Sequence, residues 1–224
     1  MPDRDRAATH IGVREVHVWT ADAADFQPGF PELSRLVVSR YCGRRPEDLQ
    51  FCHSSWGKPA VVCGFGRPIF HSLSHSGTKA AVAISAADDV GIDIELKRPG
   101  RRFHDIVEYA FSRDEIEEFS RSPEHRVCDT FYTLWTRKEA LIKAAGASVA
   151  VHMDRARVSG PPNESGWAPA FIVHENRLRF VRTLDLFPGY AGALCVRSND
   201  LKVVVRSLTP QLPIARSAPG CEND

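Results

Sequence analysis

The sequence predicts an α+β fold that is built from two similar halves. Short segments of alternating apolar and polar residues indicate β-strands, whereas residues 122–146 have the apolar spacing of an amphipathic helix. Two further segments share one layout, in which a glycine precedes an apolar strand, an aspartate turn and a second strand. They comprise Gly77, 79–85, Asp89 and 90–96 in the first copy, and Gly189, 191–197, Asp200 and 201–208 in the second. We interpret both as hairpins of a duplicated unit, although chance similarity between hairpins is the open alternative.

The halves are expected at residues 1–88 and 89–208, followed by a Pro-rich, polar and disordered tail at residues 209–224. Alternation predicts a first strand at residues 13–20, and Leu33, Leu36 and Val37 give the next helix, at residues 32–42, its inward face. Further strands are expected at 49–52, 79–85, 90–96, 168–173, 178–184, 192–197 and 201–208. Ser112 is a plausible cap for a helix that begins at FSRDE, and the role of Glu115 in that motif stays open.

The longest expected helix runs from Ser122–Pro123, a good start signal, to Gly146, a good stop signal. Its buried face is formed by apolar residues three or four positions apart, namely Val127, Phe131, Leu134, Leu141 and Ala145. Lys138 falls among these apolar positions. An amphipathic helix with a Glu139–Lys143 ion pair and a snorkelling Lys138 is the structural alternative to a functional role.

The strand at residues 90–96, VGIDIEL, carries the clearest chemical signal. Apolar residues alternate there with Gly91, Asp93 and Glu95, so one face is buried and two carboxylates leave the other. Neighbouring carboxylates repel each other, and a hard cation such as Mg²⁺ removes that repulsion. Glu139 would make a third ligand, with Lys138 and Lys143 beside it for phosphate. The two motifs together predict metal-assisted chemistry on a phosphate ester. In the second copy, Val204 and Arg206 replace the two carboxylates.

The composition of the 224 residues predicts a cytoplasmic protein without a nucleic-acid or membrane partner. Twenty-nine basic and 28 acidic residues produce no overall field for either. The first ten residues lack the apolar core of a signal peptide, and no apolar run approaches the length of a membrane span. The six cysteines form no C-x-x-C pair and no zinc spacing, so we expect reduced thiols.

Five motifs in the same order resemble those of the 4′-phosphopantetheinyl transferases, specifically the monomeric type that activates surfactin synthetase and other non-ribosomal peptide and polyketide synthases. They are GKP at Gly57–Pro59, FHSLSHSG at Phe70–Gly77, VGIDIE at Val90–Glu95, FSRDE at Phe111–Glu115 and WTRKEALIKAAG at Trp135–Gly146. The combination of VGIDIE with W-x-x-K-E-A-x-x-K is specific, whereas either motif alone is weak.

The resemblance implies a pseudo-twofold pair of similar α/β halves with the active-site cleft between them. It implies Mg²⁺-dependent transfer of 4′-phosphopantetheine from coenzyme A to a serine of an acyl or peptidyl carrier protein. The implied metal ligands are Asp93, Glu95 and Glu139, and Glu139 is either also the general base or a ligand alone. Lys143 and His75 would contact phosphates and assist catalysis, with Ser74 beside them. Gly57, Lys58 and Pro59 would line the nucleotide end, and Arg35 and Arg40 would lie near the 3′-phosphate.

One departure from the family and two alternatives stay open. Residues 20–32 are short and acidic where the family has a longer basic stretch, so a degenerate transferase that only binds coenzyme A or a carrier is one alternative. The E-x-K triplet at Glu95–Lys97 matches a Mg²⁺-dependent nuclease, although no strong basic surface for DNA is evident.

The basic residues that follow the strand predict a docking patch for an acidic carrier, or else a solvated loop. They are Lys97, Arg98, Arg101 and Arg102, with Arg113 at the next helix.

Overall fold

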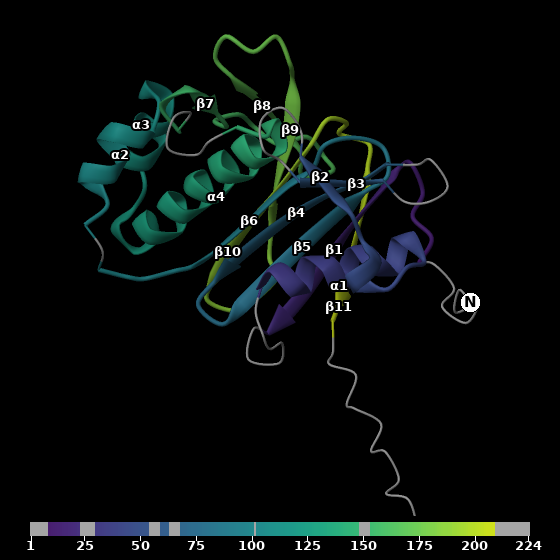
Figure 1. Cartoon of the computed structure of the whole chain (residues 1–224). Helices are drawn as coiled ribbons and strands as arrows, with labels where there is room; N and C mark the ends of the chain where they lie inside the picture. Colours follow the sequence, from purple (N-terminus) through teal and green to yellow (C-terminus); the bar gives the residue numbers. More distant parts are fainter. Residues whose placement is uncertain are drawn as a thin grey trace, which may run out of the picture.

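The computed structural model describes residues 9–22, 30–53, 59–62, 68–100, 102–147 and 153–208. Two β-sheets and four α-helices make up the described part of the chain, which confirms the expected α+β class (Figure 1). The helices are α1 (Phe30–Cys42), α2 (His104–Ala110), α3 (Arg113–Ser120) and α4 (Val127–Ala145).

The first sheet has six strands in the order β11-β1-β5-β4-β3-β2. Their bounds are β1 (Glu15–Asp22), β2 (Phe51–His53), β3 (Pro59–Val62), β4 (Pro68–Ser76), β5 (Lys79–Ser85) and β11 (Lys202–Ser207). All neighbours are antiparallel except β1 and β11, which run parallel.

The second sheet has five antiparallel strands in the order β6-β10-β9-β8-β7. Their bounds are β6 (Gly91–Leu96), β7 (Ala156–Arg157), β8 (Ala168–Ile172), β9 (Arg179–Leu184) and β10 (Tyr190–Val196). Counted along the chain, β1 to β5 and β6 to β10 have the same spatial order of first, fifth, fourth, third and second. This repeated order is the structural counterpart of the predicted duplication.

The two expected hairpins are wrong, because each turn joins strands of different sheets. Strand β5 lies between β1 and β4, and β10 lies between β6 and β9. With both edges occupied, neither strand can pair with the strand that follows it, so β6 enters the second sheet and β11 enters the first. The last strand of residues 89–208 therefore lies beside β1, and the division at residue 88 stays a prediction. The predicted tail at 209–224 lies outside the described residues.

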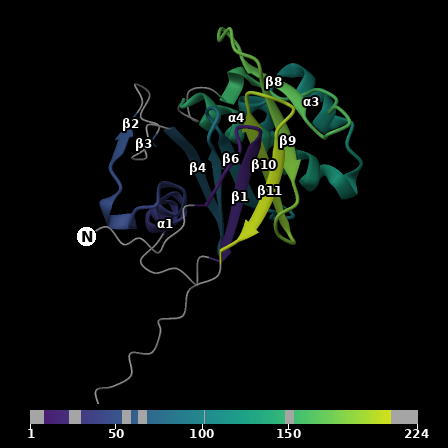
Figure 2. The same ribbon diagram turned by 90° about the vertical axis from the view of Figure 1, so that its right-hand side faces the viewer.

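Three apolar clusters arrange the molecule in layers, with helix α1, the two sheets, and helix α4 in sequence (Figure 1). Figure 2 shows β11 beside β1 at the edge of the first sheet. Helix α1 covers one face of the first sheet through residues such as Val37 and Val38, against Val82 and Ile84. The opposite face of that sheet meets the second sheet through Val16, Val18, Ile92 and Ile94, among others. The third cluster fixes α4, together with α2 and α3, on the outer face of the second sheet.

Helix α4 ends at Gly146, as expected, because this glycine has the left-handed φ of 71° that caps helices. Its start differs from the prediction. Pro123 has extended backbone and a 3₁₀ turn at Glu124–Arg126 follows, so the α-helix begins only at Val127. Ser122 Oγ bonds to the Glu118 carbonyl and to Thr130 instead of capping α4.

Among the cysteines that the structure describes, Cys42 differs from the expectation. Cys42, buried at the end of α1, is disulfide-bonded, so the prediction of reduced thiols is wrong there. A disulfide requires proximity in space, which the spacing of cysteines along a chain does not reveal. Cys128 and Cys195 are not disulfide-bonded, as expected. Within the described ranges, none of the helices combines the length and apolarity that a membrane crossing needs.

Candidate metal and phosphate site

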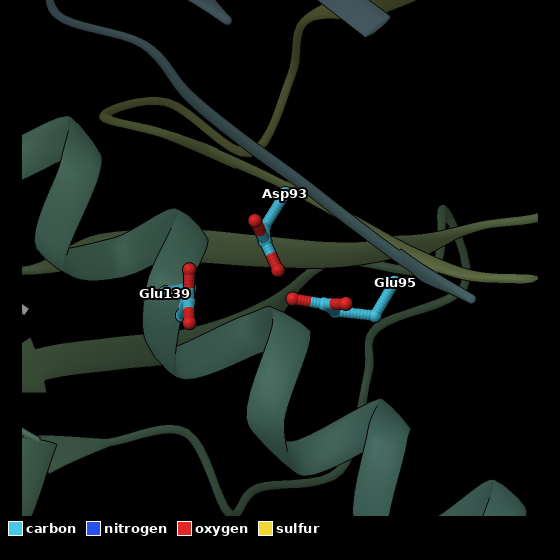
Figure 3. A group of neighbouring side chains, drawn as sticks. All are labelled: Asp93, Glu95 and Glu139. Carbon is cyan, nitrogen blue, oxygen red and sulfur yellow. The ribbon is translucent and has the colours of Figure 1, made fainter. Parts of the chain in front are cut away.

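Three carboxylates from two elements meet at one point of the structure. Asp93 and Glu95 extend from β6 and Glu139 extends from α4 toward them (Figure 3). One oxygen from each side chain lies within 4.8 Å of the others. The predicted ligand set is therefore assembled, although its members are up to 46 positions apart along the chain.

Strand alternation and one glycine produce this meeting. Gly91, Asp93 and Glu95 share the face of β6 that is turned to α4. A Cβ atom at Gly91 would lie only 2.0 Å from the Ala140 carbonyl oxygen and 2.5 Å from the Ala144 nitrogen. The helix backbone thus rests directly on the strand, and this close approach brings Glu139 to the two strand carboxylates.

The electrostatics of the cluster fit a cation. Asp93 is 1% exposed, and burial raises its pKa. Burial and then the neighbouring Asp93 raise the pKa of Glu139 to about 7. Asp93 Oδ2 is buried and has no hydrogen-bond partner among the described residues. Three oxygen ligands, one of them with an unused buried oxygen, are the donor set that Mg²⁺ accepts in proteins.

Lys143 is the cation that faces these carboxylates from α4. Its Nζ lies 2.6 Å from Asp93 Oδ1 and 3.7 Å from Glu139 Oε2, and it donates to Ser74 Oγ at 3.1 Å. The side chain is 26% exposed, so its ammonium group borders on solvent. This position suits a phosphate contact beside the carboxylates, and that role stays a prediction.

Lys138 lies elsewhere, which corrects both interpretations made from the sequence. It is fully buried, and its Nζ donates at 2.6 Å to Glu115 Oε2 and at 2.6 Å to the Ala156 carbonyl. Burial lowers the pKa of Lys138. Lys138 therefore neither reaches solvent nor pairs with Asp93, Glu95 or Glu139. An ion that is buried this deeply requires a partner at contact distance, and Lys138 has one on another side of the helix.

Glu115 is that partner and also closes the predicted cap of α3. Its Oε2 accepts from the Ser112 backbone nitrogen while Ser112 Oγ accepts from Glu115 N, which forms a capping box. Its Oε1 accepts from Val158 N at 3.0 Å. The open role of Glu115 is therefore structural. A charged residue within the apolar stripe was the sequence signal that a buried counter-ion existed.

Strand β4 contributes polar side chains to the same cluster. Ser74 Oγ donates to Asp93 Oδ1 at 2.7 Å and Ser76 Oγ donates to Glu95 Oε2 at 2.8 Å. Ser76 was missed as a site residue, although its place two positions after Ser74 on a strand was a usable signal. His75 lies between them, so it projects from the opposite face of β4, and it is exposed. The phosphate contact of His75 stays a prediction.

The residues predicted at the nucleotide end are only partly described. Gly57 and Lys58 lie outside the described residues, and Pro59 opens β3. On α1, Arg35 Nη1 donates to the carbonyls of Pro46 and Leu49, and the Arg40 guanidinium lies 4.9 Å from the centre of the Trp19 ring. Coenzyme binding by these five positions stays a prediction.

Lys97 belongs to a surface ion pair and not to the carboxylate cluster. Its Nζ lies 2.7 Å from Asp129 Oδ1 on α4. The acid–lysine arrangement that motivated the nuclease alternative is therefore not assembled. Of the other basic residues after β6, Arg98 and Arg102 are exposed, as is Arg113, while Arg101 lies outside the described part.

Comparison with known proteins identifies the family of this chain. Residues 89–195, which contain all three carboxylates and α4, match the 4′-phosphopantetheinyl transferase superfamily model. The chain is 35% identical to the 4′-phosphopantetheinyl transferase AcpT of Salmonella typhi over 51% of this chain and 57% of the relative. It is 31% identical to AcpT of Escherichia coli (58% and 71%) and 28% identical to the transferase Sfp of Bacillus subtilis (75% and 72%).

The chain belongs to the 4′-phosphopantetheinyl transferase superfamily. The matched region spans only about half of the length of several relatives, 57% for the Salmonella protein. Family membership therefore identifies the class of protein, and the particular activity of this chain is a proposal.

Proposed function

We propose that this protein transfers the 4′-phosphopantetheine group from coenzyme A to a serine of an acyl or peptidyl carrier protein, in a Mg²⁺-dependent reaction. The observation that carries the proposal is the cluster of Asp93, Glu95 and Glu139 with Lys143 beside it. Membership of the family and the names of its relatives support the same activity.

The reaction breaks the phosphoanhydride bond of the pyrophosphate in coenzyme A and forms a phosphodiester bond to the carrier serine. The carrier serine oxygen forms a bond to the β-phosphorus of coenzyme A, while the bond from that phosphorus to the oxygen of the leaving nucleotide breaks. Adenosine 3′,5′-bisphosphate leaves, and the serine proton must be accepted. Mg²⁺, when held by Asp93, Glu95 and Glu139, supplies positive charge to the pyrophosphate oxygens.

The protein's own groups have distinct parts in this proposal. Lys143, which borders on solvent beside the carboxylates, would donate to a phosphate oxygen and so stabilise the charge that develops in transfer. Glu139 is the closest candidate for the base because it is a ligand at the reacting end. A ligand role alone is the alternative. His75 leaves β4 on the other face, so its phosphate contact would be with a different group of the coenzyme.

The proposed contacts with the nucleotide end of coenzyme A come from residues 57–59 and from helix α1. Gly57, Lys58 and Pro59 would line the nucleotide, and Arg35 and Arg40 would face the 3′-phosphate. Arg98, Arg102 and Arg113 would steer an acidic carrier. We also propose that the protein acts as a cytoplasmic monomer in non-ribosomal peptide, polyketide or fatty acid synthesis.

Mass spectrometry of a carrier domain tests the proposal directly. A purified apo carrier is incubated with coenzyme A, Mg²⁺ and the full chain, and we expect its mass to increase by one phosphopantetheine group. Asp93→Asn is the matched control, because it keeps the side-chain shape and removes the charge. Coenzyme A binding without any mass gain, across several acyl and peptidyl carriers, would instead establish the degenerate binder that the acidic residues 20–32 suggest.

A further inference from the structure

We propose that Ser76 is a positioning residue that sets the metal affinity of the site by holding Glu95, as one rung of a serine ladder between the two sheets. The ladder consists of Ser72, Ser74 and Ser76 on β4. The inference deepens the proposed function, on which it rests, and concerns how the ligands are kept in place.

The ladder exists because β6 is an edge strand of the second sheet. Its neighbour β10 pairs with one side of it, so alternate N–H groups point to the other side. There the serine hydroxyls take the place of a further strand. Ile92 N donates to Ser72 Oγ at 3.2 Å, Ile94 N to Ser74 Oγ at 3.2 Å and Leu96 N to Ser76 Oγ at 3.0 Å.

Each of these backbone bonds determines the direction of the serine hydroxyl. A backbone N–H can only donate, so it occupies a lone pair of Oγ and leaves the hydroxyl hydrogen for an acceptor. Ser76 gives that hydrogen to Glu95 Oε2, and Ser74 gives its hydrogen to Asp93 Oδ1. The two strand carboxylates are thereby attached to the first sheet, while Glu139 approaches from α4.

The rung at Ser72 differs in one respect, which makes it a natural control. The residue before the N–H donor is Asp93 at the second rung and Glu95 at the third, but it is Gly91 at the first. Ser72 therefore serves the same backbone contact without a neighbouring carboxylate to orient. Loss of Ser72 and loss of Ser76 should weaken the contact between the sheets similarly, and only the latter should release a ligand.

The orientation of the Glu95 carboxylate depends on its hydrogen bond with Ser76. Glu95 is only partly buried, and several of its side-chain torsions must be restricted before it can bind a metal ion. Partners that orient metal ligands typically change metal affinity by about 10- to 100-fold when they are removed. Ser74 is less suitable for the test, since it also accepts from Lys143. Ser76→Ala isolates the positioning effect.

Titration calorimetry with Mn²⁺, on the full chain without coenzyme A, measures this effect apart from turnover. We expect Ser76→Ala to bind Mn²⁺ at least about 10-fold more weakly, whereas Ser72→Ala stays within about twofold of the parent. Both variants should show a similar decrease in melting temperature. Ser76→Thr retains the hydroxyl and should bind within about threefold of the parent.

Several results would overturn the inference. They are a parent chain that does not bind Mn²⁺, a Ser76→Ala variant with parental affinity, a Ser72→Ala variant as weak as Ser76→Ala, or a Thr variant that fails to restore binding. Transfer to a carrier is measured separately. A parent that binds Mn²⁺ but transfers nothing contradicts the proposed function, while the affinity comparison still decides the role of Ser76.

Discussion

Two lysines on α4 make equally short contacts with carboxylates in very different surroundings. Lys138 meets Glu115 at 2.6 Å and Lys143 meets Asp93 at 2.6 Å. At the first pair, the Ala156 carbonyl and the backbone nitrogens of Ser112 and Val158 complete the hydrogen bonds. At the second, Asp93 keeps a buried oxygen without a partner, and Glu139 adds a carboxylate that one lysine does not neutralise.

The difference teaches how to distinguish an ion pair that supports the fold from one that occupies a binding site. A saturated pair has nothing left with which to hold a ligand, so its removal should affect folding. A site with surplus negative charge and unused oxygen atoms is incomplete without a cation, so its alteration should affect binding and catalysis first.

Lys138→Met should produce the largest effect, a loss of about 3–5 kcal/mol in the free energy of unfolding, because it leaves Glu115 buried without its counter-charge. Urea denaturation measures it. Lys143→Met is the matched control on the same helix, and because Lys143 is partly exposed we expect it to cost about 1 kcal/mol or less. Equal losses in the two variants would contradict the comparison.

Asp93→Asn should reduce transfer to the carrier by about 10²-fold or more, since it removes a preorganised charge at the reacting end. The melting temperature should stay close to that of the parent, as the substitution also relieves repulsion with Glu139. Steady-state kinetics with a carrier domain, and a thermal melt of the same sample, provide both values. Parental turnover in this variant would exclude Asp93 from the mechanism.

The metal-free protein should lose stability as the pH rises. The pKa of Glu139 in the folded protein is raised from 4.5 to about 7, so folding favours its protonated form. That contribution is complete below about pH 4.5 and is lost as the pH rises through 7, and the raised pKa of Asp93 acts in the same direction. Between pH 6 and pH 8 in EDTA, we expect the free energy of unfolding to fall by about 1–2 kcal/mol.

Saturating Mg²⁺ should reduce this pH dependence, because a bound cation stabilises the ionised carboxylates. Glu139→Gln should reduce it as well, even without metal. Denaturant titrations at pH 6, 7 and 8, on the parent with and without Mg²⁺ and on Glu139→Gln, measure the pH dependence of the free energy of unfolding. A stability that rises with pH in the metal-free parent would show that the carboxylates are not held in unfavourable proximity.

Reversal of a charge on the exposed segment after β6 should have the smallest effect. Arg102→Glu should raise the Michaelis constant for an acidic carrier by roughly threefold at low salt, and leave that for coenzyme A unchanged, because steering acts on encounter. Arg177→Glu, an exposed arginine in the β8–β9 connection, is the control. A carrier constant that is identical in both variants would assign the segment to a solvated loop.

Periodicity determined much of this molecule from the sequence by itself. The apolar stripe around Phe131 and Leu141 is the buried face of α4, and alternation on β6 correctly separated its carboxylates from its apolar face. The grouping of Asp93, Glu95 and Glu139 as candidate ligands and the helix end at Gly146 could also be predicted. These features are local, because helix and strand geometry alone decide which side chains share a face.

Only the tertiary structure decided which partners those faces meet. Lys138 and Lys143 are five residues apart on one helix, so their side chains point to different sides of it. The sequence does not reveal that Glu115 lies on one of these sides and Asp93 on the other. The crossings of β6 and β11 between sheets likewise depend on strand edges that other strands already occupy. Ser76 became a site residue only because β4 lies along the open edge of β6, a contact between segments that no local pattern records.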